Sequence, residues 1–233
     1  MELNKTILIT GTSKGIGRYL SEYYAGKGFN VIGCSRSKSD LTVENYHHFL
    51  TDVTDETKVK EIFTFIRKKF SRLDVLINNA GIASMNHVML TPIKSVEKIF
   101  SVNFTGMFLF CREASKIMSK QKFGRIINLS SVAVKLDLEG EAVYAASKSA
   151  VVSFTKVLSK ELSEFGITVN SIGLTPVKTD LIKGVPEEKI NSLLDKLTLK
   201  KFTELRDISN LTDFLIGEES SFITGQNINF GGV

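Results

Sequence analysis

The chain has 233 residues, of which 42% are hydrophobic and 24% charged, and its formal net charge is +5. This composition excludes a disordered or collagen-like chain. Lysines and arginines are spread along the chain, not gathered into the runs typical of nucleic-acid binding, so we expect no nucleic-acid partner. No apolar run approaches the ~18 residues that cross a bilayer, and a strand-like run starts close to Met1, which leaves no room for a signal peptide. Two cysteines, Cys34 and Cys111, are too few for a disulfide framework. We expect one domain, residues 1–233, in the cytoplasm and away from membranes.

Short β-branched runs alternate with longer stretches of helical periodicity, the pattern typical of a parallel sheet covered by helices. Strands are expected at 6–10, 30–35, 48–52, 74–78, 125–130, 168–172 and 226–230. Helices are expected at 16–27, 56–70, 95–119 (with a weak point at Gly106), 142–165, 186–196 and 208–216. The predicted fold class is therefore α/β: a Rossmann-like, doubly wound, seven-stranded parallel sheet with helices on both faces.

A glycine-rich turn separates the first strand from the first helix. Gly11, Gly15 and Gly17 are spaced Gly-x3-Gly-x-Gly. Such glycines allow a sharp turn and bring backbone N–H groups close to a diphosphate at the helix N-terminus. The spacing differs from the general G-x-G-x-x-G fingerprint, and a glycine turn can be purely structural. Its place at the first strand–helix junction favours a dinucleotide site.

Further motifs follow in chain order: Asp52-Val53, Asn78-Asn79-Ala80-Gly81, Asn103 within 102–106, Ser131, Tyr144-x3-Lys148 and Thr224-Gly225-Gln226. With these motifs the sequence resembles the short-chain dehydrogenase/reductase family over essentially its whole length. Within the family it is most similar to 3-oxoacyl-acyl-carrier-protein reductases. The resemblance implies an oxidoreductase that transfers a hydride between a nicotinamide cofactor and a carbonyl carbon.

Four residues form the predicted catalytic group. Tyr144 and Lys148 are four apart on an expected helix and share one face. An ammonium group within ~4–6 Å favours the phenolate, so we expect Lys148 to lower the pKa of Tyr144 into a useful range for acid–base catalysis. Ser131 ends a strand, where its hydroxyl can bond a substrate carbonyl. The resemblance implies that Asn103 holds a water connecting Lys148 to solvent. An isolated Tyr-x3-Lys is usually a surface pair; the upstream motifs argue against that here.

The segment after the second expected strand indicates which cofactor binds. An NAD-binding fold usually places an acidic residue there to bind the ribose 2′-hydroxyl, but residues 33–38 contain none, and Asp40 lies beyond the expected turn. Arg36 can bind a 2′-phosphate, and Lys14 can approach the same group, so we predict NADP(H). The predicted cofactor-binding residues are Gly11, Ser13, Lys14, Gly15, Ile16, Gly17, Arg36, Asp52, Val53, Asn79, Ala80, Gly81, Tyr144, Lys148, Val177 and Thr179. We expect no metal site, because no histidine has a second ligand at metal spacing.

The substrate is left open by the sequence. Leu174-Thr175 stands before Pro176 where the family usually has Pro-Gly, Val134 replaces a common glycine, and residues 135–141 are unusually acidic for a fatty-acyl site. The sequence therefore allows an acyl-thioester ketone, with acyl carrier protein as a partner, or a polar ketone such as a sugar or a biosynthetic intermediate. A non-catalytic dinucleotide-binding sensor or scaffold is the alternative from another class.

Two further expectations concern mobility and assembly. Residues 179–200 lack a clear strand and follow the carboxyl end of the sixth expected strand, where ligands bind in such sheets, so we predict a substrate lid there. The helical stretch at 95–119 carries four phenylalanines, at positions 100, 104, 108 and 110. By analogy with the family, whose corresponding helices pack between subunits, we expect a homo-oligomer, a tetramer or a dimer.

Overall fold

The computed structural model describes residues 5–233, except for the side chain of Leu181. Within this range seven strands form one sheet in the order β3-β2-β1-β4-β5-β6-β7, and every neighbouring pair is parallel. The strands are β1 (Thr6–Thr10), β2 (Asn30–Ser35), β3 (Tyr46–Leu50), β4 (Val75–Asn78), β5 (Gly124–Ser131), β6 (Ile167–Leu174) and β7 (Asn227–Asn229). The strand order reverses direction between β1 and β4, which is where ligands bind in doubly wound sheets.

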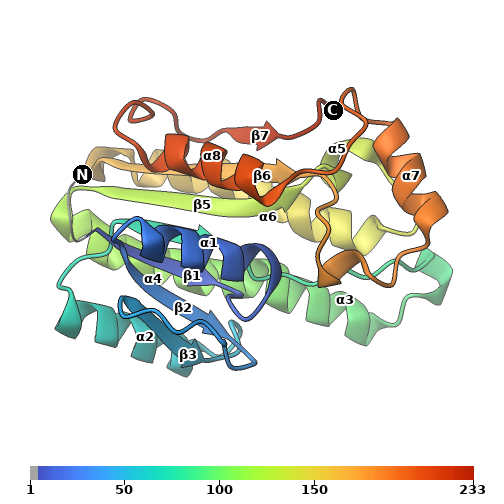
Figure 1. Ribbon diagram of the computed structural model, residues 1–233. Helices are drawn as coiled ribbons and strands as arrows, with labels where there is room; N and C mark the ends of the chain where they lie inside the picture. Colours follow the sequence, from blue (N-terminus) through green and yellow to red (C-terminus); the bar gives the residue numbers. More distant parts are fainter. Residues whose placement is uncertain (1–4) are drawn as a thin grey trace.

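Helices cover both faces of this sheet (Figure 1). The main helices are α1 (Gly15–Gly26), α2 (Glu56–Lys69), α3 (Ile93–Phe100), α4 (Met107–Gln121), α5 (Ala133–Leu136), α6 (Ala142–Glu161), α7 (Glu187–Asp195) and α8 (Leu205–Ile216). Shorter helical segments are η1 (Val88–Leu90), η2 (Ser101–Gly106), η3 (Ser163–Phe165) and η4 (Asp180–Ile182). Helices α1 and α8 lie on one face, and α2, α4 and α6 lie on the other.

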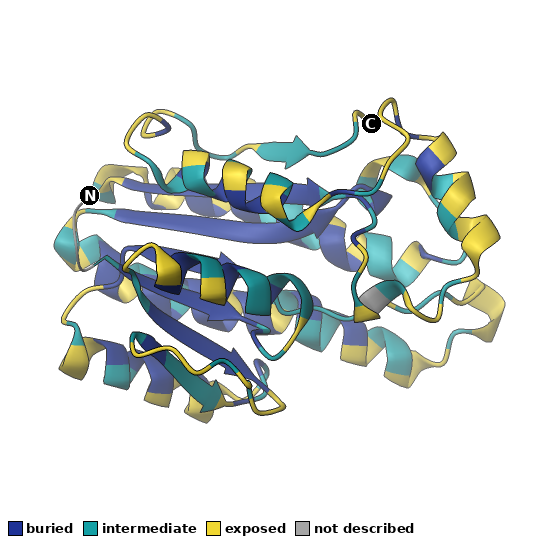
Figure 2. Cartoon of the chain, in the orientation of Figure 1, coloured by how far each residue is buried: buried dark blue, intermediate teal, exposed yellow. Residues whose placement is uncertain are grey.

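The alternation of side chains along each strand produces the two cores. Ile7 and Ile9 of β1 pack in the layer that holds α1 and α8, whereas Leu8 between them packs against α2 and α4. All three side chains are fully buried. Burying one such side chain contributes about 1.5–3 kcal/mol, so the middle of β1 is apolar on both faces. Figure 2 shows this burial, with the central strands dark blue and the outer helix faces yellow.

The structure confirms the predicted fold class, and most elements begin and end within two residues of their expected positions. The third strand is the clearest shift, because β3 covers Tyr46–Leu50 and not 48–52, so that His47 and His48 both lie within it. The predicted helix at 95–119 divides into α3, η2 and α4. The π-helical segment η2 ends at Gly106, the predicted weak point, where a Cβ would lie 2.7 Å from Val53 Cγ2.

The carboxyl ends of β5 and β6 lead to the segment that covers this edge of the sheet. Helix α7 buries Leu194 against Val132 and Leu197 in a small separate core. Its outer face is exposed in Figure 2. Among the described residues, no helix is long and apolar enough to span a membrane.

Candidate active site

The glycine-rich turn joins β1 to α1 at the centre of the sheet. Gly11 has φ +77° and Gly15 φ +59°, conformations in which glycine is not strained. A Cβ on Gly11 would lie 2.8 Å from Asn79 Nδ2, and one on Gly17 would overlap the Gly11 carbonyl oxygen. Asn79 Nδ2 donates to the Thr10 carbonyl oxygen at 2.7 Å. The turn is therefore held against β4, and only glycine fits at positions 11 and 17.

Beside this turn lies a cavity of about 470 Å³, called the first cavity below. It lies at the carboxyl ends of β1, β2 and β4. Its wall contains twelve of the predicted cofactor-binding residues: Gly11, Ser13, Lys14, Gly15, Ile16, Arg36, Asp52, Val53, Asn79, Ala80, Gly81 and Thr179. Gly17 is not in the wall, because it packs beneath Gly11.

The cations of the first cavity differ in their partners. Arg36 is exposed and forms no salt bridge with any residue in the described range 5–233. Lys14 Nζ lies 3.2 Å from Asp180 Oδ2, so the glycine turn is linked to η4. Asp40, the nearest acidic residue after β2, accepts a bond from Arg18 Nε at 2.8 Å and points toward α1. Within residues 5–233, no carboxylate therefore lies at the end of β2, where an NAD-binding fold would need one.

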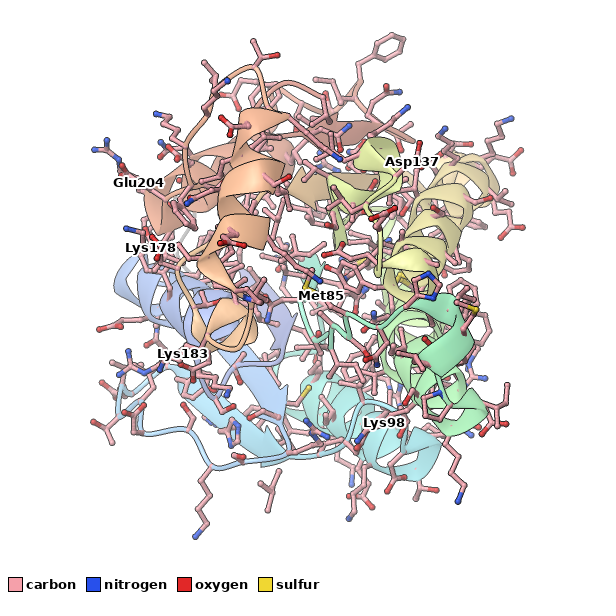
Figure 3. The ribbon with its side chains drawn as sticks, turned by 90° about the vertical axis from the view of Figure 1, so that its right-hand side faces the viewer. Met85, Lys98, Asp137, Lys178, Lys183 and Glu204 are labelled. Atoms are coloured by element: carbon pink, nitrogen blue, oxygen red, sulfur yellow. The ribbon has the colours of Figure 1, made fainter. Side chains whose placement is uncertain are left out.

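A second cavity of about 550 Å³ opens from the first, and Ile16, Asn79, Gly81, Ile82, Ala83 and Thr179 line both. Its wall contains Ser131, Tyr144, Lys148 and Val177 of the predicted site. Figure 3 looks onto this side of the molecule, with Met85, another wall residue, near the centre and Lys183 on the neighbouring segment before α7. The two cavities form one crevice along the carboxyl edge of the sheet.

Tyr144 and Lys148 lie one turn apart on α6. Lys148 is only 6% exposed, and its Nζ donates a bond to the Leu129 carbonyl oxygen at 2.8 Å and lies 6.0 Å from the Tyr144 ring centroid. Desolvation lowers the pKa of Lys148 to about 8. Burial also raises the pKa of Tyr144 to about 12, although the Ser131 hydroxyl acts in the opposite direction. The expectation of a lowered Tyr144 pKa is wrong for this structure, because burial is the largest influence on the phenol and raises its pKa. Tyr144 therefore holds its proton at neutral pH.

Asn103 lies within η2, and its side chain bonds to Ile82 and to Ser147 of α6. Its Oδ1 accepts a bond from the Ile82 N–H at 2.8 Å, and its Nδ2 donates to the Ile82 carbonyl at 2.9 Å and to Ser147 Oγ at 3.0 Å. The side chain therefore fixes the loop after Gly81 to α6. It lines neither cavity, and the water that the resemblance implies at Asn103 stays a prediction.

Sequence reasoning missed several residues of the second cavity. Glu141 lies three residues before Tyr144 and is only 9% exposed, and Lys189 of α7 lies across the cavity. The sequence analysis noted the acidity of residues 135–141 but singled out no position. The i, i+3 spacing from Tyr144 identifies Glu141, because it places both side chains on one face of a helix.

Comparisons with known proteins match this arrangement. The family model of short chain dehydrogenases matches residues 5–190. The 3-oxoacyl-[acyl-carrier-protein] reductase FabG of Escherichia coli strain K12 is 31% identical over 98% of this chain and 96% of its own. FabG of Staphylococcus aureus strain Mu50 is 33% identical over 100% of this chain and 98% of its own.

Solved structures are similar over nearly the full length. ElxO with NADP bound is 32% identical, covers 97% of this chain and 96% of its own, and superposes with a TM-score of 0.88. Ligand-free aldohexose dehydrogenase of Thermoplasma acidophilum is 26% identical over 99% of this chain and 94% of its own, with a TM-score of 0.89. From the crevice, its side chains and these similarities, we conclude that this chain belongs to the short-chain dehydrogenase family.

Proposed function

We propose that this protein is an NADPH-dependent reductase that converts a ketone to an alcohol. The observation that carries the proposal is the crevice itself. A protonated tyrosine, a serine and a buried lysine line one end, and a glycine turn with an unpaired arginine lines the other. FabG is a 3-oxoacyl-[acyl-carrier-protein] reductase by name, and ElxO has been solved with NADP bound.

The residues of the first cavity fit a dinucleotide phosphate. The glycine turn leaves a surface at the N-terminus of α1 that side chains would fill, and the helix dipole there favours a diphosphate. Arg36, with Lys14 nearby, can hold the 2′-phosphate, and Asp52 and Val53 can flank the adenine. Val177 and Thr179 lie at the junction toward the second cavity, on the side where a nicotinamide would reach the substrate. When bound, the reduced cofactor supplies the hydride.

In the proposed reaction the substrate carbonyl oxygen lies between Ser131 and Tyr144. The Ser131 hydroxyl donates a hydrogen bond to that oxygen, and Tyr144 donates its proton as the carbonyl carbon receives the hydride. The carbonyl becomes an alcohol and Tyr144 becomes a phenolate. Lys148, whose pKa of about 8 allows it to gain and lose a proton near neutral pH, returns a proton from solvent. Asn103 acts as a positioning residue that holds the Gly81 loop on α6.

The substrate class comes from similarity and from the cavity. The FabG relatives favour a 3-oxoacyl thioester, with acyl carrier protein as the partner that delivers it. A polar ketone is the second candidate, favoured by the charged side chains Glu141 and Lys189 in the second cavity. Residues 179–200 serve as the lid over this cavity in either case, because Ile182, Gly184, Val185 and Pro186 form part of its wall.

Assembly and location complete the proposal. Ile93, Phe108 and Val157 on α3, α4 and α6 are large apolar side chains at least a third exposed. They support a homodimer or homotetramer formed through these helices. Cys34 and Cys111 are buried free thiols, and burial raises the pKa of each to about 12. Unreactive single thiols fit a protein of the reducing cytoplasm.

NADPH consumption with a panel of ketones and acyl thioesters tests this function. We expect turnover of at least one ketone class, with much slower turnover when NADH replaces NADPH. Tight NADPH binding without turnover of any ketone would instead identify a non-catalytic sensor or scaffold.

A further inference from the structure

Glu141 is the one acidic side chain in the wall of the second cavity within the described part of the chain. It occupies the N-cap position of α6, yet its side chain makes no capping bond, and its own backbone carbonyl accepts from Ala145 N at 2.7 Å. Glu141, Tyr144 and Ser131 all line this cavity. A ligand in the cavity can therefore meet Glu141 and the predicted catalytic group together.

Glu141 is only 9% exposed as a residue, and its carboxylate has no hydrogen-bond or salt-bridge partner within the described range. Across residues 5–233, no described side chain or backbone group donates a hydrogen bond to it, and no cation lies within 4.0 Å. Lys189 is near enough to act on it electrostatically but forms no salt bridge with it. Burial raises the pKa of Glu141, and the nearby Lys189 acts in the opposite direction. The hydrogen-bonding capacity of the carboxylate therefore remains available for a ligand in the cavity.

The rest of the cavity does not explain a charge at this position. The same wall includes the apolar residues Val132, Met85 and Leu193, which would accept a simple acyl chain without any charge. The two other charged residues in the wall are both cations. Lys148 donates a hydrogen bond to the Leu129 carbonyl, and Lys189 lies on the predicted lid segment. A hydrogen-bond donor on the substrate would satisfy Glu141 while the carbonyl contacts Ser131 and Tyr144.

We propose that Glu141 determines substrate specificity by accepting a hydrogen bond from a hydroxyl or ammonium group that the substrate carries beside its ketone. This inference rests on the proposed ketone reductase activity and narrows its substrate to a polar ketone. A 3-oxoacyl thioester has only a methylene beside the ketone and gives Glu141 no donor.

A pair of nearly isosteric ketones tests the proposal. 1-Hydroxypropan-2-one and butan-2-one differ only at one position, where the carbon next to the carbonyl carries a hydroxyl group in the first and a methyl group in the second. 1-Aminopropan-2-one carries an ammonium group at the same position. A synthetic acetoacetyl thioester represents the acyl class. The measured quantity is the ratio of kcat/KM for the hydroxyl ketone to that for butan-2-one. The two ketones differ in intrinsic reactivity, and comparing the ratio between variants removes this difference. A substitution that disturbs Tyr144 slows the reduction of both ketones and therefore leaves the ratio unchanged.

In E141L we expect this ratio to fall about ten- to hundredfold, the range for losing a hydrogen bond to a charged group. In E141Q the amide oxygen still accepts a bond from a hydroxyl, so the hydroxyl preference should fall less. The preference for the ammonium ketone should fall in both variants, and in E141Q it should fall further than the hydroxyl preference does, because the ammonium group also loses its charge partner. The exposed neighbour Glu139 supplies the control, and E139L should leave every ratio unchanged.

The outcomes distinguish a failure of the proposed role of Glu141 from a failure of the proposed reductase activity. Turnover of these ketones with the same ratio in wild type and E141L would overturn the role of Glu141 and leave the reductase intact. A preference of the wild type for the acetoacetyl thioester over all three ketones, unaffected by E141Q, would also overturn it. Failure of the wild type to reduce any of the four compounds would overturn the proposed function itself, and this inference with it.

Discussion

Lys148 Nζ donates its hydrogen bond to the Leu129 backbone carbonyl, 2.8 Å away, and not to an acidic side chain. A neutral carbonyl cannot compensate a buried ammonium as a carboxylate would, and desolvation therefore lowers the pKa of Lys148 to about 8. Lys148 can therefore exchange its proton near neutral pH, whereas the neighbouring Tyr144 keeps its proton. The lowered pKa of Lys148 has a measurable effect on stability.

Stability should depend on pH through Lys148. Its pKa is about 8 in the folded chain and 10.5 ordinarily, so between these values the unfolded chain binds more protons and stability rises with pH. From pH 7 to pH 9.5 this group alone should add about 2 kcal/mol to the free energy of unfolding. Urea unfolding of wild type and K148M at both pH values isolates the contribution as a change in their difference. K156M, at an exposed position on the same helix, should show no such change. A pH-independent difference for K148M would contradict the lowered pKa.

Cofactor preference should reverse in R36D. A guanidinium can bind a 2′-phosphate through two charge-assisted hydrogen bonds, which favours NADPH over NADH by roughly ten- to hundredfold. The aspartate removes that partner, repels the phosphate and can bond a ribose 2′-hydroxyl. Dissociation constants for both cofactors should therefore cross over between wild type and variant. Added salt should weaken NADPH binding more than NADH binding in the wild type. Equal affinities for the two cofactors in the wild type would refute the role of Arg36.

Replacing Asn103 should lower the stability of the fold, and it should slow turnover by displacing the loop after Gly81. In N103A the backbone N–H and carbonyl of the partly buried Ile82 lose their partners, at a cost of about 0.5–1.5 kcal/mol for each hydrogen bond lost. We expect stability to fall by about 2 kcal/mol or more, and kcat to fall because the loop after Gly81 shifts. Urea unfolding and single-turnover kinetics measure the two effects. Wild-type stability in N103A would show that Asn103 does not hold this loop.

Residues 179–200 should become protected from hydrogen exchange when ligands bind. They contribute η4 and α7, and the ion pair between Lys14 and Asp180 links them to the glycine turn. We expect slow exchange across this segment with NADPH and substrate together, and faster exchange in the free protein. The buried strand β5 serves as the internal reference, since its protection should not change. Strong and equal protection in both states would exclude a lid.

Much of the fold could be predicted because a parallel strand is apolar on both faces and a covering helix on one. That rule placed β1, β2 and β5 closely. It placed β3 two residues too late, because His47 and His48 interrupt the apolar pattern of this edge strand. The π-helical η2 could be predicted only as a weak point, because no residue type marks such a segment.

The candidate site could be predicted as far as its motifs extend. Gly11, Tyr144 and Lys148 line the crevice as expected. The pKa of Tyr144 could not be predicted, because spacing gives its distance to Lys148 but not the depth at which both are buried. The position of Lys189 in the wall of the second cavity could not be predicted either, because it depends on how α7 packs over the sheet.

The most direct test of the account is the turnover of Y144F, because the central claim is that Tyr144 supplies the proton to the ketone. The substitution removes one hydroxyl and no packing, so the fold and the NADPH dissociation constant should stay close to those of the wild type. With a ketone that the wild type reduces, kcat should fall by at least ~10²-fold, as expected when an acid–base group is lost. A folded, NADPH-binding Y144F with turnover near that of the wild type would contradict the account.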